Sequence, residues 1–371
     1  MTIPIAVVGG TGTFGRRIVQ ELLESPLPFR IRVGGRTIAR FDDLFAEDIP
    51  DLEFQAVDLD DPSTLPGFLD GQKIVILAAG PFQAMQPHLA RQAARLGVHY
   101  IDLADDPGYV QKMIALAPEL ERSGKQFLIG LGSLPGLSLR LADSIWHRFD
   151  RVDEISIGLF IGNKNRRGPG SVRSALEGLA RPVPLIRGGV EQPSRAREFK
   201  RRFDFPDPIG PVSSFLIDSP DRLLFPASFN VNRLEARVGF EGTWARRGFA
   251  LFKQIADWGG LGLVLRALPA LLALASADPG GTDRGCVSVM LKGELDGGGL
   301  TLRASLYADK QGQRLASLPA VIAAEALAAG ESLPAPPAAP LNWMATPVFL
   351  ERMSLHGIDH RIDPVGPHFT S

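Results

Sequence analysis

The stretch Ile3–Glu24, IPIAVVGGTGTFGRRIVQELLE, decides how the chain begins to fold. Its apolar run at 5–8 predicts a buried strand, and the apolar spacing from Ile18 to Leu23 predicts a helix directly after it. A glycine-rich turn joins the two. This order is typical of a turn that binds the pyrophosphate of a dinucleotide, because glycines permit a sharp bend and the helix start offers free N–H groups. The predicted contacts in this turn are Gly9, Gly10, Thr11, Gly12, Thr13, Phe14 and Gly15.

The glycines of the turn fit two registers. Gly9, Gly12 and Gly15 form G-x-x-G-x-x-G, whereas Gly10 in place of Gly9 forms the tighter G-x-G-x-x-G. The alternative interpretation is an ordinary glycine-rich turn between a buried strand and a helix. A nucleotide site is favoured because the flanking strand and helix are both present.

The residues at the end of the second predicted strand, Phe29–Val33, indicate which nucleotide binds. NAD sites usually carry an acidic residue at this point for the ribose hydroxyls. Here the strand runs instead into glycines followed by Arg36 and Thr37. A guanidinium suits a 2′-phosphate, so these two residues predict NADP(H) rather than NAD(H). The alternative is that Arg36 is simply an exposed arginine after a turn.

Strands and helices alternate up to residue 131, and the strands are almost continuously apolar. This pattern predicts an α/β fold with a doubly wound parallel Rossmann sheet that is covered on both faces. Ligands of such sheets bind at the carboxyl ends of the strands. The loops after the third and fourth strands should therefore supply further cofactor contacts, at Asp58, Ala79, Gly80 and Pro81.

The pattern of apolar residues changes after residue 136. Several segments beyond it alternate like antiparallel strands, and 296–299 reads as a hairpin turn. We therefore expect a second α/β domain with a mixed or antiparallel sheet. The expected domains are 1–136 for the dinucleotide, 137–332 for substrate and dimer contacts, and 333–371 for a linker and a C-terminal helix.

Composition limits the class of protein. The chain has 371 residues, of which 45% are hydrophobic, and this is enough for two domains. A net charge of −1 argues against a nucleic-acid partner. The single cysteine, Cys286, excludes an intramolecular disulfide and fits a reducing compartment, so a cytoplasmic location is expected. The first strand begins directly after Met1-Thr2, which leaves no room for a signal peptide.

The segment 259–277 is almost entirely apolar. Arg266 and Pro269 interrupt it, and a spanning helix needs about 20 apolar residues. We therefore expect a buried or interfacial segment that does not cross a membrane. Contact with lipid or with a second subunit remains the alternative.

Four motifs together resemble the saccharopine dehydrogenase-like, or saccharopine reductase-like, family. They are GGTGTFG at 9–15, GGRT at 34–37, AAGPF at 78–82 and GVHYIDLADD at 97–106. Weaker echoes are GPGSVRSAL at 168–176 and TPVFLERMSLHGI at 346–358. The resemblance implies an NADP-linked oxidoreductase, a final helix that returns to the first domain, and a homodimer. It implies a small-molecule substrate, and both amino-acid-derived and lipid-type substrates stay open.

The predicted catalytic residues are Tyr100 and Asp102, which lie on one side of the fifth strand near its carboxyl end. The alternative for Tyr100 is core packing with a satisfied hydroxyl. For Asp105 and Asp106 the alternative to a catalytic role is capping of the helix that begins before Tyr109.

Other chemistries fit less well. No tyrosine is followed four residues later by lysine, as the short-chain dehydrogenase mechanism requires. His356 and His360 have helical spacing, but Gly357 separates them and no metal is predicted. A predicted helix start could bind a substrate anion through Gly170, Ser171 and Ser174. The alternative function is a non-catalytic NADP-binding regulatory or scaffold protein.

Overall fold

The computed structural model divides the chain into two compact units. Unit 1 comprises Met1–Gly136 and Ala316–Ala345, and unit 2 comprises Leu137–Leu315 and Thr346–Ser371. The structure describes residues 2–45, 49–165, 183–195, 198–242, 247–248, 251, 254–255, 262, 280–331 and 341–366.

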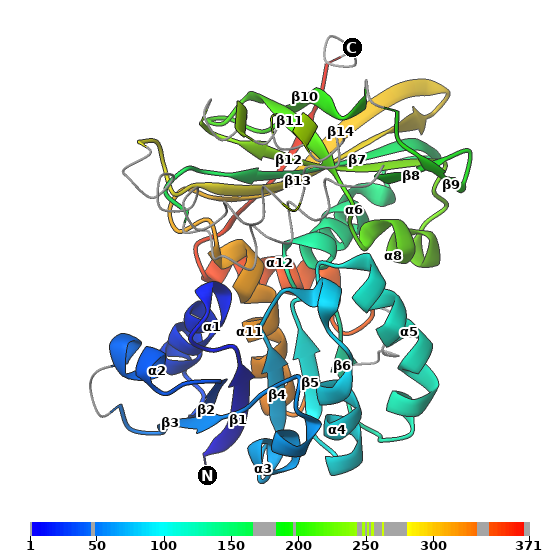
Figure 1. Cartoon of the computed structure of the whole chain (residues 1–371). Coiled ribbons are helices and arrows are strands. Elements are labelled where there is room, and N and C mark those ends of the chain that lie inside the picture. The colour runs from blue at the N-terminus through cyan, green and yellow to red at the C-terminus, as the bar shows by residue number, and fades with distance from the viewer. Residues whose placement is uncertain are drawn as a thin grey trace. The chain divides into compact units, whose positions relative to one another are not determined.

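Unit 1 is built on a six-stranded parallel sheet with the order β3-β2-β1-β4-β5-β6 (Figure 1). This is the Rossmann sheet predicted from the alternating pattern. Its strands are β1 Ile3–Val8, β2 Phe29–Gly35, β3 Leu52–Ala56, β4 Ile74–Leu77, β5 His99–Asp102 and β6 Phe127–Leu128. Its helices are α1 Thr13–Glu24, α2 Ala39–Leu44, α3 Leu65–Leu69, α4 His88–Leu96 and α5 Pro107–Glu121, with the short turns η1 Pro62–Thr64, η2 Phe82–Ala84 and η3 Ser133–Leu137.

The central strands of this sheet are buried on both faces. All four residues of β4 are buried, and residues 5–8 of β1 are at most 2% exposed. Helix α1 turns Ile18, Val19 and Leu22 toward the sheet, so the apolar spacing of the sequence marked its inner face. The burial of these apolar side chains supplies the main driving force for this half of the fold.

Unit 2 contains a nine-stranded mixed sheet with the order β10-β11-β12-β7-β13-β14-β15, to which β8 and β9 attach through β12. The predicted hairpin is present, with Asp296 and Gly297 at positive φ between two long strands. The strands are β7 Arg151–Ile161, β8 Pro184–Arg187, β9 Val190–Pro193, β10 Lys200–Asp204, β11 Pro211–Ile217, β12 Arg233–Phe240, β13 Gly285–Leu295, β14 Gly298–Ala308 and β15 Asp359–Pro364. The helices are α6 Ser138–Trp146, α8 Asp221–Ser228 and α12 Thr346–Leu355.

Two late helices group differently from the expected division. Helix α11, Arg314–Ala328, was expected in the second domain, but from Ala316 onward it belongs to unit 1. Its segment 318–326 is almost fully buried, and Ser25 Oγ beyond α1 donates to Glu325 Oε1 at 2.7 Å. An apolar helix without a polar face needs a core around it, and unit 1 provides that core.

The C-terminal helix α12 was expected to return to the first domain, but it belongs to unit 2. The buried Arg140 of α6 donates to Thr346 Oγ1 at 3.1 Å, and its guanidinium lies 5.3 Å from the centre of the Phe349 ring. A hydrogen bond and a cation–π contact therefore fix the first turn of α12 against α6.

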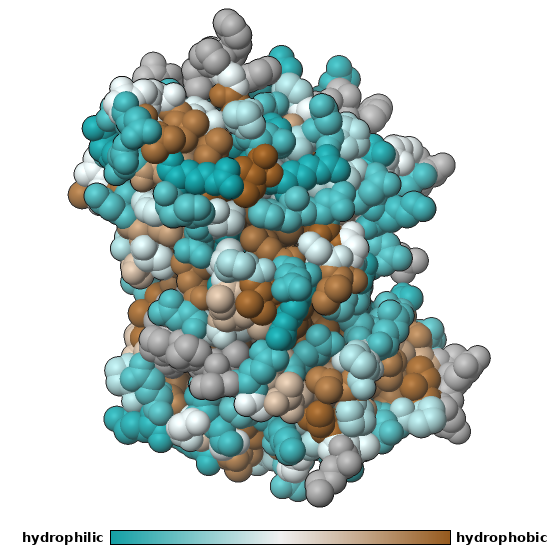
Figure 2. All heavy atoms as spheres, turned by 180° about the vertical axis from the view of Figure 1, so that it is seen from behind, coloured by the Kyte–Doolittle hydropathy of each residue, from teal (hydrophilic) through white to brown (hydrophobic). Residues whose placement is uncertain are grey.

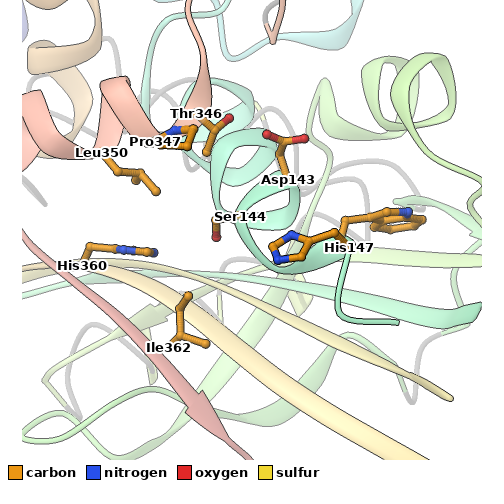
Figure 3. A pocket seen from close by; sticks show the side chains of 9 residues that line it. Asp143, Ser144, His147, Thr346, Pro347, Leu350, His360 and Ile362 are labelled. Atoms are coloured by element: carbon orange, nitrogen blue, oxygen red, sulfur yellow. The ribbon is translucent and has the colours of Figure 1, made fainter. Parts of the chain in front are cut away.

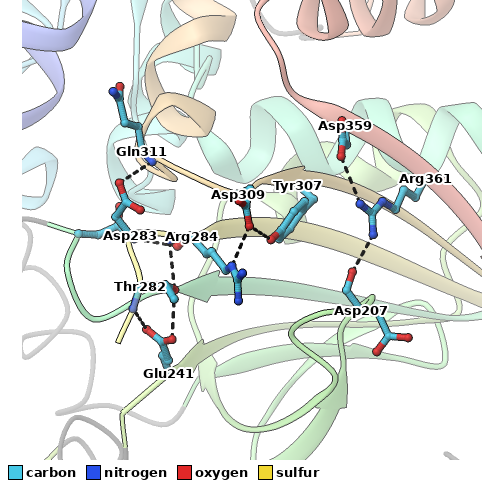
Figure 4. Close-up of polar contacts among 11 residues, drawn as sticks. Asp207, Glu241, Thr282, Asp283, Arg284, Tyr307, Asp309, Gln311, Asp359 and Arg361 are labelled. Atoms are coloured by element: carbon cyan, nitrogen blue, oxygen red, sulfur yellow. Dashed lines mark hydrogen bonds and ion pairs between the residues drawn. The ribbon is translucent and has the colours of Figure 1, made fainter. Parts of the chain in front are cut away.

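Polar contacts close one end of the second sheet (Figure 4). Asp309 accepts hydrogen bonds from the Tyr307 hydroxyl at 2.6 Å and from Arg284 Nε at 2.9 Å. Nearby, Glu241 accepts from the backbone N–H of Thr282 at 2.8 Å. These acidic side chains are thus occupied with holding strand ends and connecting loops together.

Within the described residues, no helix is both long enough and apolar enough to cross a membrane. The apolar segment 259–277 lies outside the described residues apart from Gly262. On the face drawn in Figure 2, hydrophobic residues are interspersed with hydrophilic ones.

Candidate cofactor site

The glycine-rich turn follows β1 and leads directly into α1. The Gly12 N–H donates to the Gly9 carbonyl at 2.8 Å, and the Arg16 N–H donates to the Gly12 carbonyl at 3.0 Å. The Gly9 N–H donates to the Gly34 carbonyl at the end of β2, also at 2.8 Å. These bonds hold the turn close to the carboxyl end of the sheet.

Two glycines of the turn are sterically required. Gly9 has φ +79°, and a Cβ there would lie 2.7 Å from backbone atoms of Ala79. A Cβ on Gly15 would lie 2.1 Å from the Gly9 carbonyl oxygen. A side chain at Gly9 would push the turn away from the loop after β4, and one at Gly15 would push α1 away from the turn, so both glycines permit the tight packing of a dinucleotide-binding turn. The contacts favour the register that contains Gly9, and the cradle fits a dinucleotide.

The start of α1 is prepared for an anion. Gly12 is the N-cap residue and provides no side-chain capping bond, and the first turn of this fully described helix contains no acidic residue. Its first backbone N–H groups therefore keep their hydrogen-bonding capacity and the positive end of the helix dipole. A phosphate at this point would satisfy both.

The turn lies where the strand order reverses, between β1 and β4. The loop after β4 stands opposite it, with Ala79 and Pro81 half-buried and Gly80 exposed. In open parallel sheets this switch point is where dinucleotides bind. The structure thus brings the predicted Ala79 beside Gly9, in direct backbone contact.

Arg36 and Thr37 are exposed just beyond β2. Among the described residues, no side chain or carbonyl forms a hydrogen bond or ion pair with the Arg36 guanidinium. Arg32 on the same strand differs, because it donates to Glu53 at 2.7 Å and to the Phe68 carbonyl at 2.9 Å. Within this part of the chain the donors of Arg36 are therefore available to a ligand, as a 2′-phosphate site requires.

Asp58 closes its own loop after β3. Its carboxylate accepts from the Asp60 N–H at 3.0 Å, and its carbonyl accepts from Thr64 Oγ1 at the same distance. The side chain is half-buried, so this predicted contact has only part of its capacity left for an adenosine.

Tyr100 and Asp102 are both completely buried, at 0% exposure. The Tyr100 hydroxyl donates to Asp102 Oδ2 at 3.0 Å, which agrees with the expectation that both side chains point the same way. Burial raises the pKa of Asp102 to about 6, although three hydrogen bonds oppose the rise. Because neither group reaches the surface, the geometry argues against direct contact with a substrate and matches the alternative of a satisfied core hydroxyl.

The remaining predicted residues are placed as follows. Asp106 caps α5, since its carboxylate accepts from the Tyr109 N–H at 2.7 Å. The capping interpretation is therefore confirmed for Asp106.

His356 follows α12 while His360 lies on β15, so the two do not share a helix. No group of three His, Cys, Asp or Glu side chains suited to a metal occurs among the described residues. Gly170, Ser171 and Ser174 lie outside them.

A groove with a volume of about 580 Å³ lies within unit 2, beside α6 and α12. Figure 3 shows Ser144 between His147 and His360. Burial lowers the pKa of His360. Of the lining residues, His360 was considered as a metal ligand in the sequence, and Thr346, Pro347 and Leu350 belong to the motif at 346–358. The lining is Asp143, Ser144, Trp146, His147, Thr346, Pro347, Leu350, His360 and Ile362.

Sequence reasoning missed two partners of the Tyr100–Asp102 pair. The Tyr109 hydroxyl lies 3.0 Å from the Tyr100 hydroxyl, and the Gly130 N–H donates to Asp102 Oδ1 at 2.7 Å. Tyr109 was visible in the sequence only as a residue beyond a helix cap. No local pattern links Gly130 to a carboxylate 28 positions earlier.

Comparisons with known proteins agree with this geometry. Residues 5–128 match the family model for the saccharopine dehydrogenase NADP binding domain. The structure resembles apo saccharopine dehydrogenase (L-Glu forming) from Saccharomyces cerevisiae with a TM-score of 0.69 and 13% identity, covering 98% of this chain and 100% of that one. At this identity the likeness shows a shared fold.

Other similarities are weaker. A dehydrogenase from Chromobacterium violaceum has a TM-score of 0.44 at 11% identity and covers 96% of this chain and 95% of its own. Myo-inositol dehydrogenase from Corynebacterium glutamicum has a TM-score of 0.45 at 9% identity, covering 99% of this chain and 100% of its own. A search of curated proteins found no match. Residues 5–128 thus match the NADP-binding domain of saccharopine dehydrogenase, and the chain as a whole shares the fold of saccharopine dehydrogenase.

Proposed function

We propose that this protein is an NADP(H)-dependent oxidoreductase that moves a hydride between the nicotinamide and a small amino-acid-derived or lipid-type substrate. The observation that carries the proposal is the cradle at the switch point, where Cβ atoms on Gly9 and Gly15 would collide with backbone at 2.7 and 2.1 Å. Contacts this close let the turn pack tightly between the loop after β4 and the start of α1, as the glycines of a dinucleotide-binding turn do.

The preference for a 2′-phosphate rests on Arg36. It stands exposed at the end of β2, and nothing among the described residues neutralises it. A forked, permanently charged donor would bind a phosphate in two directions at once, whereas the ribose diol of NADH would leave the charge unused. Thr37 beside it would add a hydroxyl.

The bound cofactor would supply the hydride chemistry. The chain would contribute the rest: the glycine turn holds the diphosphate, Arg36 fixes the adenosine end, and the loop 78–81 borders the other half of the crevice. Holding the reacting partners in one orientation accounts for a large share of the rate enhancement of such enzymes.

The test is a fluorescence titration of the purified full-length protein with NADPH and NADH. We expect tighter binding of NADPH, and Arg36→Ala should weaken NADPH binding about tenfold while leaving NADH unchanged. Arg30→Ala is the matched control, because Arg30 is an exposed arginine at the other end of the same strand. Equal affinities of the wild type for the two nucleotides would remove the NADP assignment.

A second candidate is a non-catalytic NADP-binding regulatory or scaffold protein. The complete burial of Tyr100 and Asp102 favours it, because the two expected proton donors cannot reach a substrate in this conformation. Oxidation of NADPH with a panel of carbonyl and imine substrates distinguishes the candidates. Turnover of any of them would decide for the enzyme.

The expected homodimer, the cytoplasmic location and a contact of 259–277 with membrane remain predictions. Sedimentation of the purified protein tests the first, cell fractionation the second, and vesicle flotation the third.

A further inference from the structure

A continuous buried chain of hydrogen bonds runs from the end of β5 to the first turn of α5. Tyr109 and Tyr100 join through their hydroxyls at 3.0 Å, and Tyr100 donates to Asp102 Oδ2 at 3.0 Å. The three residues are 1%, 0% and 0% exposed. Every polar side-chain atom in this chain of hydrogen bonds has a partner, so the network specifies one arrangement of β5 and α5.

Both ends of this hydrogen-bond network hold loops at the carboxyl edge of the sheet. Asp102 Oδ1 accepts from the Gly130 N–H at 2.7 Å and from the Ala104 N–H at 3.0 Å, which fixes the loops after β6 and β5. At the other end the Tyr109 ring packs on Phe82 in the turn after β4, with ring centres 5.1 Å apart. One buried network therefore holds three neighbouring loops.

These three loops belong to one half of the sheet. Strands β4, β5 and β6 follow β1 on the side opposite β2 and β3. In a doubly wound sheet that half borders the nicotinamide, while the half with β2 borders the adenosine. We propose that the chain of Asp102, Tyr100 and Tyr109 is a positioning device for the nicotinamide half of the cofactor. This inference rests on the proposed NADP(H) function.

Loss of one side chain from this hydrogen-bond network should displace the loops that the network holds. The Asp102 carboxylate receives three donors, and its removal would leave the buried N–H of Gly130 without a partner. An unsatisfied buried donor is relieved when its loop moves toward water. A binding site tolerates only about 0.5 Å of such movement before contacts are lost.

The experiment compares two ligands that share the adenosine end. NADPH spans both halves, and adenosine 2′,5′-bisphosphate occupies only the adenosine half. We expect Asp102→Ala to weaken NADPH binding about tenfold or more and Tyr109→Phe about threefold, with adenosine 2′,5′-bisphosphate within about twofold of wild type for both. Tyr307→Phe is the matched control, since it removes a Tyr–Asp hydrogen bond of 2.6 Å in unit 2.

The outcomes separate the two proposals. Loss confined to NADPH, in variants with the circular dichroism of the wild type, supports the positioning role. Equal weakening of both ligands, or no weakening of either by Tyr109→Phe and Asp102→Ala, overturns it while the NADP(H) function stands. A wild type that binds neither ligand overturns both. Tyr109→Phe keeps the test decisive if Asp102→Ala fails to fold, because it deletes a single hydroxyl.

Discussion

Replacement of Gly9 by alanine tests the cradle most directly, because two separate costs meet at this residue. Its φ of +79° lies in the left-handed region, where a Cβ costs about 1–2 kcal/mol. The new Cβ would also lie 2.7 Å from backbone atoms of Ala79, which follow a fully buried strand and cannot move aside cheaply. Together these costs predict a loss of about 2–4 kcal/mol in the free energy of unfolding.

Two further glycines separate the costs. Gly71 has φ +72°, and a Cβ added there would meet no atom within 4 Å, so Gly71→Ala carries the backbone cost alone, about 1 kcal/mol. Gly15 has ordinary helical φ, but a Cβ would approach the Gly9 oxygen to 2.1 Å, so Gly15→Ala carries the collision alone. We expect urea unfolding to rank Gly71→Ala as the mildest of the three changes.

The same variants should differ in cofactor binding. Gly9→Ala and Gly15→Ala should weaken NADPH binding by about thirtyfold or more, since the turn must shift by a large part of an ångström to relieve the contacts. Gly71→Ala lies outside the cradle and should bind as the wild type does. If all three variants were equally stable and bound NADPH alike, the steric reasoning would be refuted.

Three other changes have predictable effects. Burial raises the pKa of Asp221 from 3.8 to about 6, so the folded state holds a proton that the unfolded chain has released. The free energy of unfolding should therefore fall by about 2 kcal/mol as pH rises from 4 to 6, and Asp221→Asn should flatten this slope in urea titrations. Glu235→Gln should lower the free energy of unfolding by about 3 kcal/mol, because the Glu235 carboxylate, 2.6 Å from the guanidinium of Arg237, neutralises an arginine that is only 1% exposed. Thermal or urea unfolding measures this loss, and an unchanged stability would contradict the prediction. Ser25→Ala should cost about 1 kcal/mol, through loss of the 2.7 Å bond to Glu325, and a larger loss would point to an additional role for the hydroxyl.

Local patterns accounted for most of unit 1. The apolar run at 5–8, the glycines and the spacing at 18–23 specify a strand, a turn and a helix through contacts only a few residues long. The Arg36 position followed from the same logic, because it needed only the end of one strand. The strand pairing of unit 2 could not be predicted from local patterns, because β7 pairs with both β12 and β13, which lie far from it in the sequence.

The sequence by itself determined the Rossmann sheet, the glycine cradle and the arginine beyond β2, because each depends on neighbours along the chain. Only the tertiary structure decided that Tyr100 and Asp102 are buried, since their partners Tyr109 and Gly130 arrive from other elements. It likewise assigned α11 to unit 1 and α12 to unit 2. Burial and long-range hydrogen bonding are properties of the packed chain, and no spacing along the sequence encodes which distant segment will cover a given side chain.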